Sequence, residues 1–228
     1  MPNNHQTILA VESSTKACSV SLSHHNQQFS EFEIAPQQHA NLMLGMVESV
    51  MKQASITGAE IDGIALCEGP GAFTGVRIAA GVVQGLAYGW QKPVQSISSL
   101  EALAWQAYEE FGSKQTIACM DARMQEMYLQ SCEVIDGKLY AKPAKMVSAE
   151  DAEEIIIQSG FQCGIGDIQT DFLATSQLFK QWHSAYPNAE YIAKIANQRT
   201  EQFKSLQEKI PLPVYLRNNI AVKKGQQK

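Results

Sequence analysis

A glycine-rich turn between an apolar strand and a helix is the stretch of this sequence best suited to chemistry. It reads Glu68-Gly-Pro-Gly-Ala-Phe-Thr-Gly-Val-Arg-Ile78 and follows the short apolar run Ile64–Cys67. Thr74 stands where a helix N-cap is expected, so a helix is predicted over 75–87. The backbone N–H groups of such a turn and helix N-terminus favour an anion, which makes Gly71 and Thr74 candidate phosphate contacts.

The same turn has a structural interpretation without a ligand. It lacks the Gly-Lys-Ser/Thr ending of a nucleotide P-loop and the Gly-x-Gly-x-x-Gly pattern of a dinucleotide site. On this interpretation it is a tight connection between strand and helix. The anion site is therefore one of two alternatives that the sequence leaves open.

The helix after the turn carries a stripe of glycines. Gly81, Gly85 and Gly89 recur at every fourth residue, and each costs about 1 kcal/mol relative to alanine in a helix interior. Close approach of another backbone would offset that cost. The stripe predicts tight packing, either within the chain or against another molecule.

The elements that position this turn repeat in two halves. Strands predicted over 7–11, 18–22 and 28–34, helix 39–55, strand 64–67, helix 75–87, strand 93–97 and helix 99–111 form the first half. Strands over 116–120, 127–135, 139–142 and 162–165 and helices over 149–158, 171–183 and 191–208 form the second. Each half opens with a three-stranded meander, which indicates a duplicated α/β architecture with a cleft between two domains that meet near residue 112.

The predicted helix 39–55 has an unusually wide apolar face that is rich in methionine. Leu42, Met46 and Val50 lie on it at helical spacing. Such a face is usually part of a core. Methionine also adapts to varied shapes, which suits a surface for a partner.

Composition limits the class of protein. The chain has 228 residues, a net charge of −5 and five widely spaced cysteines without a C-x-x-C pair. These features predict buried free thiols in a reducing compartment, which we take to be the cytoplasm, and no membrane span or secretory signal. The acidic balance argues against a protein that holds nucleic acid by itself.

Four motifs carry a resemblance to a known family. They are Val11-Glu-Ser-Ser-Thr15, the run 68–78, Met120-Asp-Ala-Arg-Met-Gln-Glu-Met-Tyr128 and Pro213-Val-Tyr-Leu-Arg-Asn-Asn219. Together with matches over essentially the whole chain, they resemble the TsaB (YeaZ) family. The resemblance implies the actin-like α/β fold of acetate and sugar kinases and heat-shock ATPases, with domains over 1–111 and 112–228.

The resemblance also implies a function. It predicts a non-catalytic partner of the related enzyme TsaD, which with the ATPase TsaE transfers threonylcarbamoyl to N6 of adenosine 37 in tRNA. The chain alone is expected to form a homodimer and to bind tRNA only within the complex. The residues expected at the partner interface lie on the first two helices: Leu42, Met46, Val50, Ile78, Gly81, Val82 and Gly85.

Catalytic residues of the relatives have no counterparts in this chain. TsaD binds a metal through a His-x-x-x-His pair, and Ser99 and Leu103 occupy the corresponding positions here. His5, His24, His25, His39 and His183 include no pair at that spacing. No metal or cofactor is therefore expected on this chain, and ATP, ADP and metal are expected on the partner subunits.

An actin-like kinase that binds ATP is the alternative. Its phosphate-binding hairpins would be 13–16 and 121–125, neither of which contains glycine. Glu12 would have to serve as the metal-binding acid, and Asp121 and Glu126 could pair for acid–base work or hold a cation. Arg123 could reach a phosphate on a partner. A third alternative, a direct RNA-binding module, is disfavoured by the acidic charge.

Overall fold

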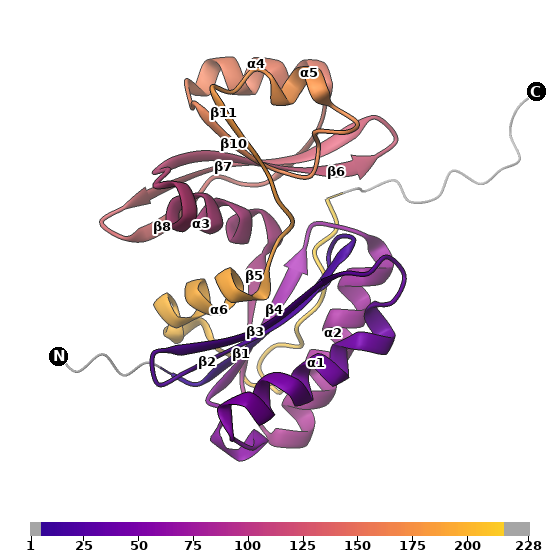
Figure 1. Ribbon diagram of the computed structural model, residues 1–228, viewed down its shortest axis with the longest axis vertical. Coiled ribbons are helices and arrows are strands. Elements are labelled where there is room, and N and C mark those ends of the chain that lie inside the picture. Colours follow the sequence, from indigo (N-terminus) through magenta and orange to yellow (C-terminus); the bar gives the residue numbers. More distant parts are fainter. Residues whose placement is uncertain (1–5, 217–228) are drawn as a thin grey trace, which may run out of the picture.

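The computed structural model describes residues 6–216, whose helices and two sheets stack in alternating layers (Figure 1). The first sheet contains β1 (Ile8–Glu12), β2 (Ala17–His24), β3 (Gln27–Ile34), β4 (Gly63–Gly69) and β5 (Val94–Ser98). The second contains β6 (Gln115–Arg123), β7 (Glu126–Ile135), β8 (Lys138–Ala141), β9 (Lys145–Ser148), β10 (Cys163–Gly166) and β11 (Gln181–Ser184). The α-helices are α1 (His39–Ala54), α2 (Phe73–Trp90), α3 (Ser99–Phe111), α4 (Ala149–Ser159), α5 (Leu173–Ser176) and α6 (Ala189–Gln198), and the short 3₁₀ turns are η1 (Gly58–Glu60) and η2 (Thr200–Gln202).

The two sheets have related topologies. The first has strand order β3-β2-β1-β4-β5, and the second has order β11-β10-β6-β7-β8, with β9 also paired to β7. In both, an antiparallel hairpin (β1–β2 or β6–β7) adjoins parallel strands, since β1 pairs with β4 and β6 pairs with β10 in parallel. The duplication predicted from the sequence pattern is therefore present in the strand pairing.

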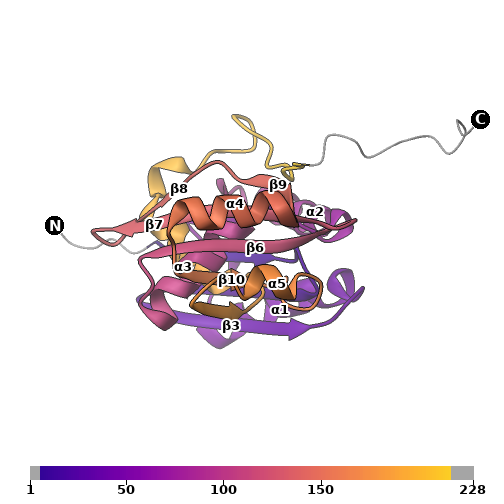
Figure 2. The same cartoon turned by 90° about the horizontal axis from the view of Figure 1, so that it is seen from above.

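Helices cover both faces of each sheet. Apolar side chains of α1 and α2 form one core with the first sheet, and α6 closes its other face. The helix α3 packs on the near face of the second sheet, and α4 covers its outer face (Figures 1 and 2). Because α6 contacts β1 and β2, the chain comes back to the first half after the second sheet.

Two predicted helices are wrong in part. Residues 171–183 form the short α5 and then strand β11, because Phe179 and Trp182 pack over Gly164, where an added Cβ would lie 2.6 and 2.7 Å from their rings. The helix predicted over 191–208 ends at Gln198. Beyond it, Arg199 leaves helical geometry and its guanidinium donates to Glu101 at 2.8 Å.

The remaining predicted helices and strands agree closely with the structure, although the pattern did not indicate β9. All five cysteines are buried and free. None of the helices formed by residues 6–216 combines the length and apolarity needed to span a bilayer. Part of the Pro213–Asn219 motif lies outside the described residues.

Candidate functional site

The turn between β1 and β2 is packed against the start of α2. The Ser13 hydroxyl donates to the Gly75 carbonyl at 2.9 Å, and the Ala72 N–H donates to the Ser14 carbonyl at 2.7 Å. An added Cβ at Gly71 would lie 2.3 Å from the Ser14 carbonyl oxygen, and one at Gly75 would lie 1.9 Å from that of Ser13. Glycine is required at both positions because two backbones touch there.

These contacts correct the prediction for Thr74. The helix begins at Phe73, its N-cap is Ala72, and the exposed Thr74 lies inside the first turn. The β1–β2 turn holds the N-terminus of α2, so a side-chain N-cap is not needed. Of the two candidate phosphate contacts on this turn, Gly71 lies against the Ser14 carbonyl and Thr74 is exposed, which favours the structural interpretation of the glycine-rich turn.

Glu12 is fully buried at the end of β1. Its Oε1 accepts from the Ser14 N–H at 2.6 Å, and its side chain lies within the protein rather than in a cleft. Burial, which disfavours a charge, raises the pKa of Glu12 to about 7. A carboxyl in this position is a weak candidate for holding a solvated metal ion.

The β6–β7 turn in the second half is open to solvent. Asp121 accepts from the Arg123 N–H at 2.7 Å and pairs with the Arg123 guanidinium at 2.9 Å, and the Arg123 side chain is 71% exposed. Arg123, Met124 and Gln125 all have positive φ, between 56° and 66°. The turn therefore presents a cation at the surface on a strained backbone.

Asp167, which the sequence motifs did not indicate, lies beside this turn. Its Oδ1 accepts from the Asp121 N–H at 2.9 Å. Burial and the nearby Asp121 raise the pKa of Asp167 to about 6. It also lines a cavity of about 240 Å³ with Gly166, Gln169 and Ser184 among its walls. The only sequence signal for it is its place directly after the strand Gly164-Ile-Gly166.

The two residues expected at the positions of metal-binding histidines belong to the core. Ser99 and Leu103 are fully buried on α3, and the Ser99 hydroxyl donates to the Pro70 carbonyl at 2.6 Å. Within residues 6–216, no group of three His, Cys, Asp or Glu side chains is arranged to hold a metal ion. Ser99 thus links the glycine-rich turn to α3, and Leu103 packs in the core between α3 and the second sheet.

The glycine stripe on α2 faces open space. No atom lies within 4 Å of a Cβ added at Gly81, Gly85 or Gly89, so packing within the chain does not explain the stripe. Ile78 and Val82, which are half-buried, lie beside the glycine stripe, on the side of the helix opposite to Gln84. We call Ile78, Gly81, Val82, Gly85 and Gly89 the α2 outer face.

The predicted interface residues of α1 do not lie together on its surface. Val50 is fully buried and Met46 is 8% exposed, so both belong to the core beneath α1. Leu42 shares a side of the helix with Ser49, whose hydroxyl donates to Glu31 of β3, and so it faces β3. The exposed large apolar side chain of α1 is that of Leu44, at 57%.

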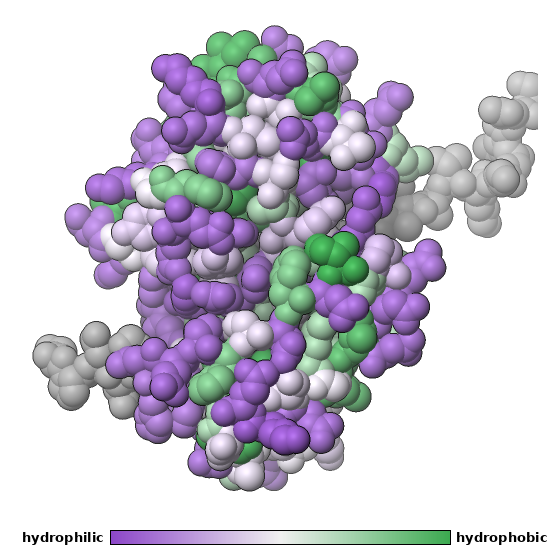
Figure 3. All heavy atoms as spheres, viewed as in Figure 1, coloured by the Kyte–Doolittle hydropathy of each residue, from purple (hydrophilic) through white to green (hydrophobic). Residues whose placement is uncertain are grey.

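A C-terminal strap, residues 204–216, runs beside the other side of α2. The Gln84 amide donates to the Pro211 carbonyl at 2.7 Å, and Val214 N–H donates to the Glu68 carbonyl at 2.8 Å. Tyr215 accepts from Arg77 Nε at 2.8 Å, and the Arg77 guanidinium lies 3.6 Å from the centre of the Phe73 ring. The strap leaves the α2 outer face uncovered, and apolar atoms gather among polar ones over the α1 and α2 region (Figure 3).

Sequence comparisons match the chain to proteins of tRNA threonylcarbamoyladenosine synthesis. A family model described as TsaD, tRNA N6-adenosine threonylcarbamoyltransferase, matches residues 32–224. The chain is 32% identical to the tRNA threonylcarbamoyladenosine biosynthesis protein TsaB of Haemophilus influenzae, over 96% of each chain. It is 32% identical to TsaB of Escherichia coli, over 95% of this chain and 97% of that one.

Two solved structures are similar to this chain over most of its length. YeaZ from Pseudomonas aeruginosa superposes with a TM-score of 0.82 and 33% identity, over 92% of this chain and all of that one. A second Pseudomonas aeruginosa structure, described as similar to peptidase YEAZ, has a TM-score of 0.83 and 34% identity, over 93% and 100% of the two chains. The actin-like α/β fold predicted from the resemblance is confirmed.

Proposed function

Because the chain belongs to the TsaB (YeaZ) family of tRNA threonylcarbamoyladenosine biosynthesis proteins, we propose that it is the scaffolding and activating partner of a TsaD-like catalytic subunit. In this role it performs no chemistry itself. With a TsaE-like ATPase the complex would modify N6 of adenosine 37 in tRNA. The proposed location is the cytoplasm, which the five buried free thiols support.

The observation that carries the proposal is the open glycine stripe of the α2 outer face. Gly81 and Gly85 lie in the helix interior, where each glycine costs about 1 kcal/mol, and nothing in the described part of the chain uses the space that they and Gly89 leave. A helix of another subunit could approach the backbone closely there. The TsaD-like subunit is the preferred occupant, and a second copy of this chain would occupy the face when that subunit is absent.

The packing of the first turn supports a non-catalytic role. In actin-like ATPases this turn holds phosphate, whereas here the Ser13 hydroxyl and Ser14 carbonyl bond to the start of α2. A phosphate would have to displace those contacts. We therefore propose that ATP, ADP and the metal belong to the partner subunits.

Substitutions on the α2 outer face test the proposal. Gly85→Leu leaves the fold intact, because an added Cβ meets no atom within 4 Å, but it fills the space required by a close-packed helix. Val82→Glu places a charge in the same contact, where an unpaired charge costs several kcal/mol. Both variants should lose co-purification with the TsaD-like subunit while retaining the wild-type circular dichroism spectrum.

The matched control is Glu153→Leu, which adds the same side chain at an exposed position of α4 in the other half. It should co-purify like the wild-type chain. Retention of the catalytic subunit by both α2 variants would refute the proposed interface.

A further inference from the structure

A second recognition surface lies at the edge of the first sheet. The strand β5 ends the order β3-β2-β1-β4-β5, so one of its sides has no neighbouring strand. The strap covers only the start of that side, where Val94 and Lys204 exchange two backbone hydrogen bonds of 2.8 and 2.9 Å. An uncovered strand edge is a template for another extended chain.

The alternating direction of the backbone groups along β5 identifies the residue that is free to pair with another strand. Val94 directs both of its backbone groups outward to Lys204, whereas Pro93 accepts from Ile64 of β4 at 3.0 Å. Because alternate residues of an edge strand face the same side, the N–H and C=O of Ser96 also point outward. No hydrogen bond within residues 6–216 joins them to a segment beyond the edge.

The open edge lies at the base of a trough. Two adjoining cavities of about 420 and 430 Å³ share Glu68 and Ser96 in their walls. One wall is the strap, and the other includes Gln202 of η2 and Arg199. From Val94 to Ser98 the strand advances roughly 13 Å, the length of about four extended residues.

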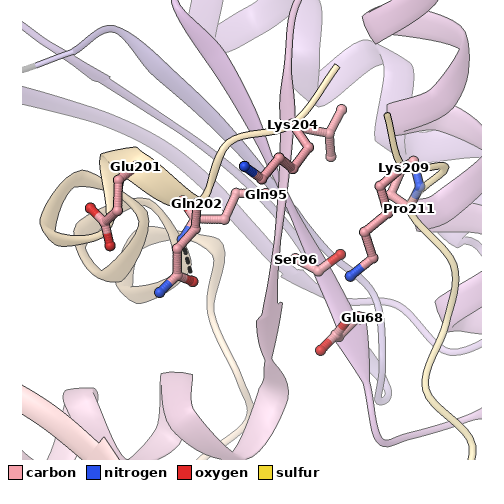
Figure 4. A pocket seen from close by; sticks show the side chains of 9 residues that line it. Glu68, Gln95, Ser96, Glu201, Gln202, Lys204, Lys209 and Pro211 are labelled. Atoms are coloured by element: carbon pink, nitrogen blue, oxygen red, sulfur yellow. Dashed lines mark hydrogen bonds between the residues drawn. The ribbon is translucent and has the colours of Figure 1, made fainter. Parts of the chain in front are cut away.

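A buried amide whose oxygen is unpaired lines this trough. Gln95 is only 2% exposed and lines the cavity, and its Oε1 has no hydrogen-bond partner. Its Nε2 reaches Gln202 at 3.4 Å. Figure 4 shows Gln95, Gln202 and the Lys204 side chain grouped on one side, and Glu68, Ser96 and Lys209 on the other. Leaving a buried acceptor unpaired is costly, so a donor from a ligand is expected there.

The charges in the trough favour a neutral polar ligand. Lys209 lies near Glu68 and attracts that carboxylate, and Glu101 is paired with Arg199 at 2.8 Å. Lys204 lines the same cavity as Gln95 and supplies a donor on its wall. A carboxamide side chain would serve both groups, since its NH₂ donates to Gln95 and its oxygen accepts from Lys204.

From these observations we propose that the β5 edge binds an extended polar segment of a partner protein by strand addition, paired with Ser96 and carrying an Asn or Gln side chain against Gln95 and Lys204. Main-chain pairing supplies the affinity and the amide supplies the selectivity. This surface is separate from the α2 outer face, so it does not depend on the proposed function.

The test uses the full chain, labelled with ¹⁵N, and the peptide Ac-Thr-Thr-Gln-Thr-Thr-NH₂. Saturable shifts are expected at the Ser96 backbone amide and the Gln95 side-chain amide. The peptide with Leu in place of Gln, and the peptide N-methylated at its three central residues, should each bind at least about fivefold more weakly, the effect of losing roughly 1 kcal/mol. Equal binding of all three peptides, or no shift at Ser96, would overturn the proposal.

Variants of the chain separate main-chain from side-chain recognition. Ser96→Pro removes the outward N–H without breaking the β4 pairing and should abolish binding, whereas Ser96→Ala should retain it. Should Ser96→Pro fail to fold, Lys204→Ala provides the second measurement and should weaken binding about fivefold, consistent with one lost hydrogen bond. Lys138→Ala, an exposed lysine on β8, is the control; a loss as large as that of Lys204→Ala would contradict the assignment.

Discussion

The turns that open the two halves of the molecule have opposite surroundings. The β1–β2 turn is enclosed, because Gly71 and Gly75 bring the start of α2 into backbone contact with Ser13 and Ser14. The β6–β7 turn projects into solvent, and Met124 at its tip is 80% exposed. The two halves thus contain equivalent hairpins, of which the first is packed against a helix terminus and the second is open to solvent.

The acids beside the two turns differ in the same way. Glu12 is fully buried at the closed turn, whereas Asp167 lines a cavity of about 240 Å³ beside the open one. Burial raises the pKa of both, to about 7 for Glu12 and about 6 for Asp167. Burial thus raises the pKa of both acids, although Asp167 lines a cavity and Glu12 is enclosed in the protein.

Opening the closed turn should have the largest effect. Gly75→Ala forces a Cβ to within 1.9 Å of the Ser13 carbonyl oxygen, and the backbone must separate to relieve the clash. We expect a loss of roughly 3–5 kcal/mol in the free energy of unfolding, as for other severe backbone clashes. Urea denaturation measures it.

Gly85→Ala, on the same helix, is the matched control. Its Cβ meets no atom, so the variant should gain up to about 1 kcal/mol from helix propensity. Equal effects of the two alanines would mean that α2 does not press on the β1–β2 turn.

The buried acid at the closed turn should give a pH-dependent effect of intermediate size. The pKa of Glu12 is about 7 in the folded chain, against 4.5 for an unperturbed glutamate, so the unfolded state loses this proton at lower pH. Stability is therefore lost as pH rises from about 4.5 to 7, by about 3 kcal/mol in total. Glu12→Gln, which keeps the oxygen that accepts from Ser14, should remove this loss at pH 8 and change little at pH 4.

Asp167→Asn provides the comparison with the open turn. Because the pKa of Asp167 is about 6, the loss of folding stability that this carboxyl causes should be complete by about pH 6 rather than pH 7. The variant should lack this loss. Unfolding midpoints measured across this range distinguish the two acids. A flat profile for wild type between pH 4.5 and 7 would argue against a buried carboxyl at Glu12.

The smallest effect is expected at the strained open turn. Gln125 has a φ of 63°, in the left-handed region that residues other than glycine rarely adopt. Gln125→Gly should raise the free energy of unfolding by up to about 1 kcal/mol, because glycine adopts this conformation without steric cost. Thermal unfolding of the two chains checks this, and a destabilised variant would show that the Gln125 side chain contributes more than the strain costs.

Local pattern predicts the first half well because its strands and helices have clear periodicity. It fails where tertiary contacts override propensity. Thr74 resembles an N-cap in the sequence, yet the Ser14 carbonyl holds the start of α2. Residues 171–183 are spaced like a helix, but Phe179 and Trp182 are drawn over Gly164, which no local pattern signals.

The candidate surface is predictable in part. The glycine spacing identifies the α2 outer face, whereas periodicity does not tell which side of α1 faces the sheet, so Met46 and Val50 are predicted at an interface although they are core residues. Asp167 escapes prediction because its proximity to Asp121 arises from the pairing of β10 with β6. Contacts between distant segments are fixed by topology rather than by spacing.

The central claim is that this chain acts by assembling with a catalytic subunit. The most direct measurement is reconstitution with TsaD-like and TsaE-like subunits, unmodified tRNA and threonylcarbamoyl-AMP, in which each protein is omitted in turn and N6-threonylcarbamoyladenosine is quantified by mass spectrometry. We predict product with the full set and none when this chain is omitted or supplied alone. Product formed by this chain without the TsaD-like subunit would contradict the account.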